Sequence, residues 1–435
     1  MNKFIAIIIS SIVLILILFN NFAHEKPIDE INEKIEFRTQ DIEKGAQLAL
    51  IGDCATCHTK SGGEKYSGGV PLPTPFGTIY STNITPDDKT GIGTWSFEAF
   101  KRSMREGVDR DGKHLYPAFP YDYFSKTSDA DLEYLYAFLM SLPPVQMEPH
   151  PNELKFPFSI RELLAGWKML FLDDKKFEPD PSMSDEENRG AYLVSSLGHC
   201  GACHSPRNIL GAVIRSKELN GGEAEGWVAP AIGNASSSKV SWTIDDYADY
   251  LFDGWSEAHG IAGGPMTPVV DNLYDANEDD VFAIATWLAA VTPSQEKSKR
   301  DDLLKEASIL DWPAVPGSIF DEVIIDDDLK FGQEIFSSSC AKCHKERISD
   351  KQPVSLALST AINATKPTNF LNIVRYGIEP PYGSTSRKMQ PIELTDEQLI
   401  ALSKYVRFHF ANKKPWDNLA KEVKASAKNI STNSH

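Results

Sequence analysis

The sequence has no cysteine to spare for disulfide bonds. Its six cysteines form three pairs, the members of each pair stand three positions apart, and a histidine follows each pair at once. An exported protein with six cysteines would ordinarily hold three disulfides, but this strict pairing leaves none to crosslink distant segments. The three motifs are Cys54, Cys57 and His58; Cys200, Cys203 and His204; and Cys340, Cys343 and His344.

Positive charge is also scarce. The chain has 44 Lys and Arg against 61 Asp and Glu, a formal net charge of -17. Because phosphate binding needs a basic face, we expect no nucleic acid partner. With 41% hydrophobic and 24% charged residues, the composition is that of soluble globular domains, and 435 residues suggest about three of them.

No run of about 20 apolar residues occurs, and the longest candidate is the uncharged stretch 4–19 behind Lys3. This stretch is long for a cleavable signal and short for a membrane span, and Ala23 is the small residue nearest a cleavage point. The sequence leaves open whether residues 1–23 are a signal peptide or an N-terminal anchor. In both cases Lys3 stays inside, which predicts export to the periplasmic side of a bacterial cytoplasmic membrane.

The C-x-x-C-H motif fits the covalent attachment of haem. Two thiols on one face of a short helical turn match the two haem vinyl groups, and the adjoining histidine then points its imidazole at the iron. Thioredoxin-like pairs and zinc ribbons do not require a histidine after every pair. We therefore predict three covalently bound haem c groups, with His58, His204 and His344 as iron ligands.

The surroundings of the three motifs repeat. A glycine that permits close helix packing precedes each motif, at Gly45, Gly190 and Gly332. Each unit closes with an amphipathic helix behind a capping residue: 129–142 behind Ser128, 278–291 behind Asn277 and 396–410 behind Thr395. A helix, a haem motif, loops and a closing helix make up the small unit of class I cytochromes c. The pattern predicts an all-α fold of three such domains in tandem.

We place the three cytochrome c domains at residues 37–142, 182–295 and 329–412. The Pro-rich bridge 143–181 holds an amphipathic stretch, 158–172, that we expect to pack across a domain seam rather than touch a membrane. Residues 296–328 form a charged linker. For the tail, 413–435, we expect a frayed, solvated terminus, with a short amphipathic piece at a membrane surface as the alternative.

Methionines at a fixed register suggest the sixth iron ligands. In each unit a helix is expected to end at a glycine, and twelve residues further on lie Phe119, Met266 and Met389. Thioether sulfur stabilises ferrous haem, so Met266 and Met389 are the candidate distal ligands. Phe119 cannot bind iron. For the first haem, Met104, His114 and an open or water-bound site remain, and we expect this haem to differ spectroscopically from the other two.

Four stretches resemble the cytochrome c subunits of membrane-bound bacterial dehydrogenases: 81–100 (STNITPDDKTGIGTWSFEAF), 115–124 (LYPAFPYDYF), 188–208 (NRGAYLVSSLGHCGACHSPRN) and 263–270 (GGPMTPVV). Members accompany dehydrogenases for alcohols, gluconate or sorbitol, or molybdenum hydroxylases for aldehydes and N-heterocycles. The resemblance supports the three histidines and two methionines as ligands. Its alcohol branch usually carries methionine at the position of Phe119, so this chain looks closer to the molybdenum-hydroxylase branch.

The resemblance implies an electron-transfer subunit. Electrons would pass from a quinoprotein, flavoprotein or molybdenum-hydroxylase subunit, at the inner membrane surface, to a membrane quinone or a downstream cytochrome. Two alternatives remain: a haem enzyme such as a peroxidase that uses an open first haem with His114 as its distal residue, or a free periplasmic electron shuttle. The sequence does not identify the dehydrogenase, its substrate or the order of electron flow.

Overall fold

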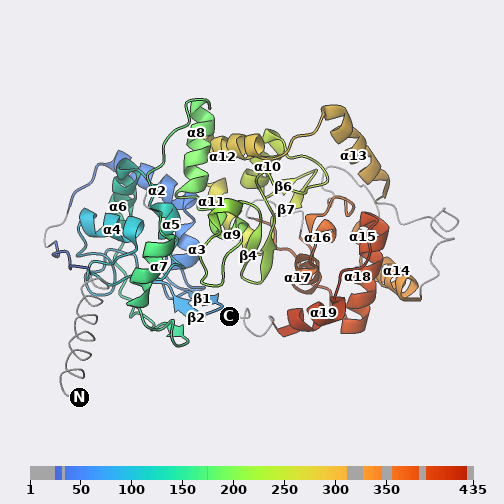
Figure 1. Cartoon of the computed structure of the whole chain (residues 1–435), viewed down its shortest axis with the longest axis horizontal. Helices are drawn as coiled ribbons and strands as arrows, with labels where there is room; N and C mark the ends of the chain where they lie inside the picture. Colours follow the sequence, from blue (N-terminus) through green and yellow to red (C-terminus); the bar gives the residue numbers. More distant parts are fainter. Residues whose placement is uncertain are drawn as a thin grey trace, which may run out of the picture. The chain divides into compact units, whose positions relative to one another are not determined.

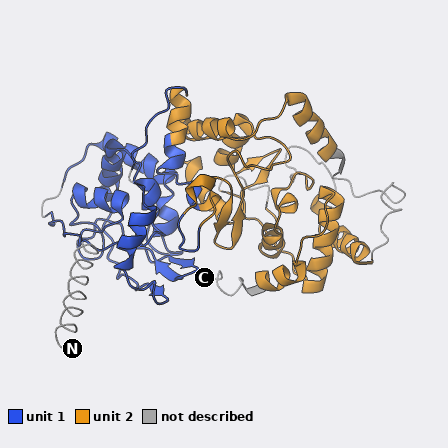
Figure 2. Ribbon diagram, in the orientation of Figure 1, with its two compact units in different colours: residues 1–182, 192–202, 208–212 blue, residues 183–191, 203–207, 213–435 orange. Residues whose placement is uncertain are grey.

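The computed structural model describes residues 25–31, 35–173, 175–310, 327–344, 355–381 and 388–428 (Figure 1). The predicted leader, 1–23, lies outside these residues. The chain divides into two compact units, one of residues 1–182, 192–202 and 208–212, the other of 183–191, 203–207 and 213–435 (Figure 2). Within the described part, no helix has both the length and the hydropathy that crossing a bilayer requires.

The helices predicted on either side of each haem motif are present. They form three pairs: α2 (Thr39–Ile51) with α6 (Asp129–Ser141), α8 (Asp185–Ser195) with α12 (Glu278–Val291), and α14 (Asp327–Ser339) with α18 (Asp396–Ala411). The glycine in each first helix allows a close crossing, because a methyl group there would collide with a carbonyl oxygen of the closing helix. The colliding pairs are Gly45 with Tyr134, Gly190 with Ala283, and Gly332 with Ala401.

The predicted caps begin the closing helices. The side chains of Ser128, Asn277 and Thr395 each accept a hydrogen bond from the amide three residues on. The predicted apolar stripes face inward, since the following residues are buried: Leu132, Leu135, Tyr136, Leu139, Leu399, Leu402, Tyr405 and Val406. Helix boundaries and buried faces therefore follow the sequence pattern closely.

Short helices and strands connect these pairs. The remaining helices are α3 (Cys54–His58), α4 (Phe97–Glu106), α5 (Tyr121–Phe124), α7 (Leu163–Phe171), α9 (Gly201–His204), η1 (Arg215–Lys217), α10 (Ile244–Asp253), α11 (Met266–Tyr274), α13 (Lys297–Leu310), α15 (Ala341–His344), α16 (Thr360–Asn363), α17 (Thr368–Tyr376) and α19 (Leu419–Lys428). The described residues also contain three small antiparallel sheets: β1 (Pro71–Thr74), β2 (Gly77–Tyr80) and β3 (Glu153–Leu154); β4 (Gly222–Ala224) and β5 (Trp227–Ala229); β6 (Trp255–Ser256) and β7 (Gly260–Ile261).

The all-α prediction therefore needs a correction, because the fold is mainly helical with short strand pairs. Tight glycine turns return the chain on itself, and the two arms then satisfy each other's backbone groups. Gly77 (φ 130°) begins β2, and Gly226 (φ 78°) lies between β4 and β5. The apolar residues repeat at helical spacing, and the strands are too short to show an alternating pattern of their own. The sequence pattern therefore did not predict these strands.

In the second unit, α17 joins the β4–β5 hairpin. The Asn369 side chain accepts a hydrogen bond from the Val228 amide and donates one to its carbonyl, both at 2.8 Å, as a neighbouring strand would. Asn372 also donates to the Gly226 carbonyl (3.1 Å). These bonds tie the surroundings of the second haem motif to those of the third within one compact unit.

The linker and tail differ from their predictions. Residues 297–310 of the expected linker are helix α13, whose Ala307 is buried, while 311–326 lie outside the described residues. The prediction of a solvated tail was wrong, because Trp416, Leu419 and Val423 are buried in the core formed with α14 and α18. Three apolar side chains among lysines gave too weak a pattern to reveal this docking.

Candidate haem sites

The three C-x-x-C-H motifs share one local geometry. Each ends in a short helix that terminates at its histidine, namely α3, α9 and α15. In every motif the first cysteine is half-buried and the second is exposed, and all six are thiols without a disulfide. The repeated pattern of one sheltered and one accessible thiol fits a flat group that lies across each motif and is bonded at both cysteines.

The first thiol of two motifs is protonated because it is sheltered from solvent. Burial raises the pKa of the Cys54 thiol to about 12 and that of Cys340 to about 11, so both are protonated near neutrality. Zinc binds thiolates, usually with four ligands gathered in a tetrahedron. The described residues contain no group of three or more His, Cys, Asp or Glu side chains that could hold a metal ion. The donor set fits covalent haem attachment instead.

Two of the predicted iron ligands are held in a binding tautomer. Nδ1 of His58 lies 2.6 Å from the Thr82 carbonyl, and Nδ1 of His204 lies 2.7 Å from the Pro230 carbonyl. Because a carbonyl only accepts, Nδ1 must carry the proton, and Nε2 keeps its lone pair for the iron. Burial lowers the pKa of both imidazoles, which favours the neutral form that binds iron.

The third histidine has part of its surroundings outside the described residues. His344 is half-buried, burial lowers its pKa, and its Nδ1 has no hydrogen-bond partner among the residues that the structure describes. The adjoining segment 345–354 lies outside them. The third motif thus presents the same two thiols and imidazole as the other two. No described carbonyl accepts a hydrogen bond from its Nδ1.

Sequence reasoning missed the two supporting carbonyls. After each of the first two motifs, a glycine brings the chain back to the motif histidine. The Gly68 amide donates to the His58 carbonyl (2.7 Å), and the Gly221 amide donates to the His204 carbonyl (2.8 Å). The chain then comes back a second time to offer Thr82 or Pro230. An isoleucine two residues later, Ile84 or Ile232, is the shared mark in the sequence, and it is too common to be diagnostic.

The helices predicted to end at a glycine do so. Gly107, Gly254 and Gly377 follow α4, α10 and α17, and their φ angles of 60°, 69° and 73° lie in the left-handed region that favours glycine. Met104 of α4 is buried, as are Leu251 and Val374 at the same register in the other helices. This agreement supports Met104 as a core residue.

Phe119 and Met266 occupy equivalent backbone positions. Their amides donate to the carbonyls of Tyr116 (3.1 Å) and Gly263 (3.4 Å), three residues earlier in each case. The turns that precede them also match, because Val108 pairs with His114 in one and Trp255 pairs with Ile261 in the other. Phe119 lies five positions after His114, and Met266 lies five positions after Ile261. The structure therefore puts Phe119 after the first haem motif at the backbone position that the candidate ligand Met266 occupies after the second.

Met389 does not share that position. It pairs through both backbone hydrogen bonds, 2.8 and 3.0 Å, with Ile378, the residue after Gly377. In backbone register it corresponds to His114 and Ile261 rather than to Met266. The equal count of twelve residues is thus not an equal place in the fold, and Met389 remains a candidate on its chemistry and half-buried position alone.

His114 is buried, although a lone histidine in a loop is more often solvent-facing. Its backbone is held on both sides, by the bridge to Val108 and by a hydrogen bond from Arg161 to its carbonyl (2.7 Å). Loop residues are often exposed, but this loop is covered by the bridge segment that carries Arg161. A lone histidine between Lys113 and Leu115 gave no signal of that cover.

Within the first compact unit, the surroundings of the first motif contact the segment that leads into the second motif. A methyl group at Gly52 would lie 3.2 Å from the Cys54 sulfur and 3.7 Å from the Leu197 carbonyl, which precedes the second motif. The ring of His199, next to Cys200, contacts the ring of Phe124 with centroids 5.5 Å apart, and Phe124 contacts Phe119 at 5.3 Å. These contacts bring residues 197–199, just before the second motif, against the surroundings of the first motif.

Comparison with known proteins bears on the whole arrangement. A family model described as cytochrome c matches residues 42–143, and one described as cytochrome C oxidase, cbb3-type, subunit III, matches residues 327–406. A nicotinate dehydrogenase subunit of Pseudomonas putida is 44% identical over 88% of this chain, which spans only 31% of that subunit's length.

Two further relatives match along most of their own length. The fructose dehydrogenase cytochrome subunit of Gluconobacter japonicus is 34% identical over 89% of this chain and 84% of its own. The gluconate 2-dehydrogenase cytochrome c subunit of Pantoea cypripedii is 34% identical over 91% of both chains.

Proposed function

Because the chain belongs to the family of cytochrome c subunits of dehydrogenases, we propose that it carries electrons through three haem c groups from a catalytic dehydrogenase subunit to a membrane quinone or a downstream cytochrome. The observation that carries this proposal is the threefold repetition of one local site. Each motif offers one sheltered thiol, one accessible thiol and one half-buried imidazole at the end of a short helix.

The residues present define what the protein contributes. Bound haem supplies one-electron exchange between ferric and ferrous iron. The cysteine pairs fix the group covalently, and the Thr82 and Pro230 carbonyls orient the His58 and His204 imidazoles. We assign Met266 and Met389 as distal ligands of the second and third haems. Phe119 leaves the first haem without a methionine at that position.

We propose three cytochrome c domains, at residues 37–142, 182–295 and 329–412. The two family models overlap the first and third, with matches at residues 42–143 and 327–406. The repeated helix crossing at Gly190 and the Pro230 carbonyl support the second. We also propose export to the periplasmic face of the membrane, with residues 1–23 as a signal peptide or an N-terminal anchor.

The relatives named above support an electron carrier rather than a peroxidase. Peroxide chemistry requires a polar group beside an open iron position, whereas the backbone position of Met266 carries the apolar Phe119 in the first unit. A dehydrogenase partner follows from the names of the relatives, and its cofactor class, whether quinone, flavin or molybdenum, would be identified by the subunit that co-purifies.

Haem counting tests the proposal. We expect a pyridine haemochrome assay on the purified protein to give three haems per chain, and Cys340→Ser with Cys343→Ser to give two. We also expect a large subunit to co-purify from membranes and its substrate to reduce the haems. Two haems in the unaltered chain would contradict the assignment. So would a protein that is released from the membrane without any dehydrogenase subunit, as a free shuttle would be.

A further inference from the structure

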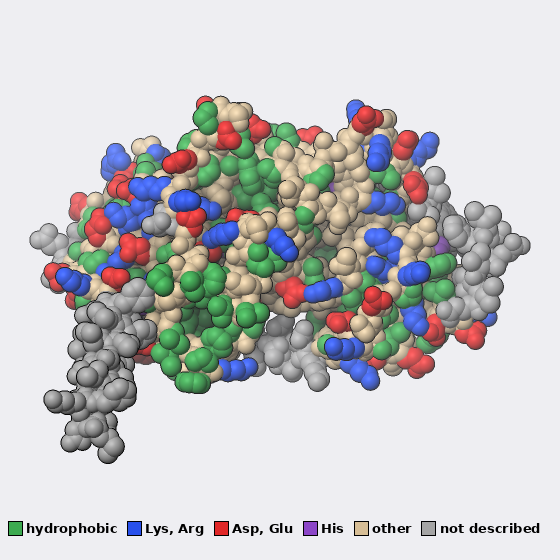
Figure 3. Space-filling model, viewed as in Figure 1, with side chains coloured by type: hydrophobic (Ala, Val, Ile, Leu, Met, Phe, Trp, Pro, Cys, Tyr) green, Lys and Arg blue, Asp and Glu red, His purple; other side chains and the backbone are tan. Residues whose placement is uncertain are grey.

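The first compact unit carries an exposed apolar face. It consists of Phe156, Leu163, Met169 and Leu170 of the bridge and of Ile209 and Leu210 in the loop after the second haem motif. Phe156 is 81% exposed, Met169 70% and Ile209 92%. In Figure 3 hydrophobic side chains gather over α7 and the β1–β2 hairpin. Monomeric proteins rarely expose so many large apolar side chains together, so this face marks an interaction surface.

The two segments of the apolar face are joined to each other. The Trp167 indole in α7 donates to the Leu210 carbonyl (2.9 Å), which fixes the loop against the helix. Phe76 contacts the Phe158 ring with centroids 4.5 Å apart and also lies against Gly211. The face is therefore continuous, although its segments are far apart in the sequence.

The apolar face is also held rigidly. Lys168 of α7 is buried and donates to the carbonyls of Glu106 (2.6 Å) and Gly107 (3.0 Å), and burial lowers its pKa to about 8. The Tyr116 hydroxyl donates to the Phe158 carbonyl (3.2 Å). The helix thus turns its cation inward and Met169 and Leu170 outward. This inverted arrangement is built by specific bonds to the 106–116 loop and is not a frayed end.

The N-terminal segment reaches the same loop. The described chain begins at Glu25, whose amide donates to the Gly112 carbonyl (3.4 Å), and the Ile28 amide donates to the Arg110 carbonyl (2.9 Å). The uncharged stretch 4–19 precedes this entry point by a few residues, which reach at most about 20 Å when extended. A membrane-held leader would thus keep the unit with the apolar face close to the bilayer.

We infer that the apolar face rests in the surface of the membrane, with lipid as its occupant. This inference departs from the sequence-based expectation that the stretch 158–172 packs across a domain seam rather than touching a membrane. This inference rests on the proposed function, which brings the protein to the periplasmic side of the bilayer. The face has no cluster of basic side chains, so binding comes from insertion of apolar groups rather than from attraction to anionic lipids. It also brings the unit with the first haem motif to the membrane, where quinone is dissolved.

A nitroxide label tests the inference in the full-length haem protein. Met169→Cys carries the label on the apolar face, and Glu133→Cys, at an exposed position of α6, is the control. On adding phosphatidylcholine vesicles, we expect the Met169 label to become at least tenfold less accessible to a water-soluble relaxant and more accessible to oxygen, in low and high salt alike. The control label should not change.

Other results would overturn the inference. A Met169 label that stays water-accessible on vesicles excludes lipid contact, and protection that disappears in high salt indicates charge-driven binding. Protection that appears only with the dehydrogenase subunit would assign the face to that protein. The proposed function is checked separately, because a chain with three haems reduced by its dehydrogenase can still fail the label test, whereas a wrong haem count sinks the function itself.

Discussion

At the scale of single residues, the first haem differs from the second through one side chain. Phe119 and Met266 follow the same turn and use the same backbone hydrogen bond, so the difference is a substitution and not a shift of the chain. A phenylalanine ring offers no lone pair to iron. Met104 of α4 is buried in the core. Leu251 and Val374, at the equivalent positions of α10 and α17, are buried as well.

The variant Phe119→Met should restore a third His/Met haem. Thioether ligation stabilises the ferrous state, so one reduction potential should rise on the order of 100 mV, well inside the range that axial ligands control. Magnetic circular dichroism in the near infrared would count the methionine-ligated haems, with two expected in the unaltered chain and three in the variant.

Met266→Phe provides the matched control, because it makes the second unit resemble the first and should leave a single His/Met haem. An unaltered chain that already shows three methionine-ligated haems would refute the assignment and point to Met104. A histidine signature at the first haem would instead point to His114, whose side chain is buried beside this turn.

At the scale of elements, the tail helix α19 is part of a core. The Trp416 indole donates to the Ala364 carbonyl (2.9 Å), and the Arg407 guanidinium lies over its ring, 4.2 Å from the centroid. Trp416→Ala should therefore lower the free energy of unfolding by about 3–5 kcal/mol, the usual cost of emptying a buried aromatic site. Denaturant titration would measure it, with exposed Lys421→Ala as a control within about 0.5 kcal/mol.

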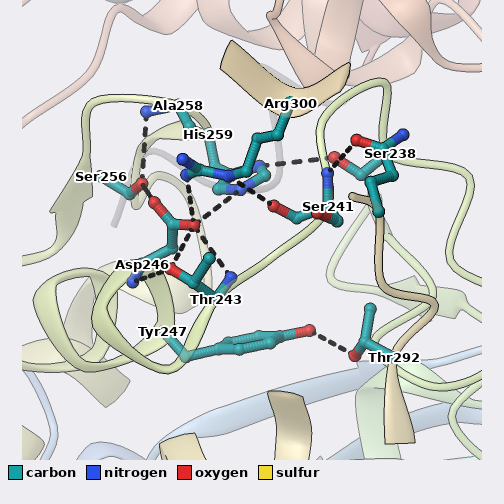
Figure 4. A network of polar contacts seen from close by, with 11 residues as sticks. Ser238, Ser241, Thr243, Asp246, Tyr247, Ser256, Ala258, His259, Thr292 and Arg300 are labelled. Atoms are coloured by element: carbon teal, nitrogen blue, oxygen red, sulfur yellow. Dashed lines mark hydrogen bonds and ion pairs between the residues drawn. The ribbon is translucent and has the colours of Figure 1, made fainter. Parts of the chain in front are cut away.

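A buried polar network joins α10 to α13 (Figure 4). The Asp246 carboxylate accepts hydrogen bonds from the Thr243 amide (2.9 Å) and hydroxyl (2.7 Å), and from Arg300 of α13 (2.7 Å). Nε2 of His259 lies 3.7 Å away, and its ring stacks on Trp242 at 3.6 Å. The expected linker is thus fastened to the second haem unit by charge as well as by packing.

This network should make the protein less stable in acid. Burial alone raises the pKa of Asp246, but the His259 contact and the Thr243 hydrogen bonds outweigh it and hold the pKa below its usual range. Its contribution is complete above the unfolded pKa of about 3.9 and is lost progressively as the pH falls from there through the lower pKa of the folded protein. Burial lowers the pKa of His259, so protonation of the unfolded chain below about pH 6.5 costs further stability.

The variant Asp246→Asn should cost about 1–3 kcal/mol near neutral pH, because Arg300 then loses its buried partner. The decline in stability below about pH 4 should flatten, while the decline that begins near pH 6.5 remains. Urea titrations at several pH values would measure both. Asp245→Asn, exposed on the same helix, should leave the whole profile unchanged.

At the scale of the whole molecule, two compact units each carry a hydrophobic core, so we expect each unit to unfold as a separate cooperative structure. Gly45→Ala pushes α2 away from α6 in the first unit, and Gly332→Ala does the same to α14 and α18 in the second. We expect two calorimetric transitions, with each substitution lowering a different one by about 2–4 °C per kcal/mol of lost stability.

Overpacking of this kind costs about 1–3 kcal/mol or more. Gly166→Ala is the matched control, because a methyl group at this position of α7 would meet no packed atom within 4 Å and alanine favours helix. It should leave both transitions in place or raise one slightly. A single transition shifted equally by Gly45→Ala and Gly332→Ala would show that the two units unfold as one.

The sequence by itself determined the features that depend on near neighbours along the chain. Cysteines and a histidine within five residues define each haem motif, a side-chain cap starts each closing helix, and a glycine ends each helix in the middle of a unit. The close helix crossings were also foreseeable, since only glycine leaves room there.

Tertiary structure alone decided what depends on distant segments meeting. It selected the Thr82 and Pro230 carbonyls behind the histidines, separated Met389 from the register of Met266, and buried His114 and Trp416. None of these follows from spacing, because a hydrogen bond or an apolar contact between remote segments is fixed by how the loops return, and loops have no periodic pattern.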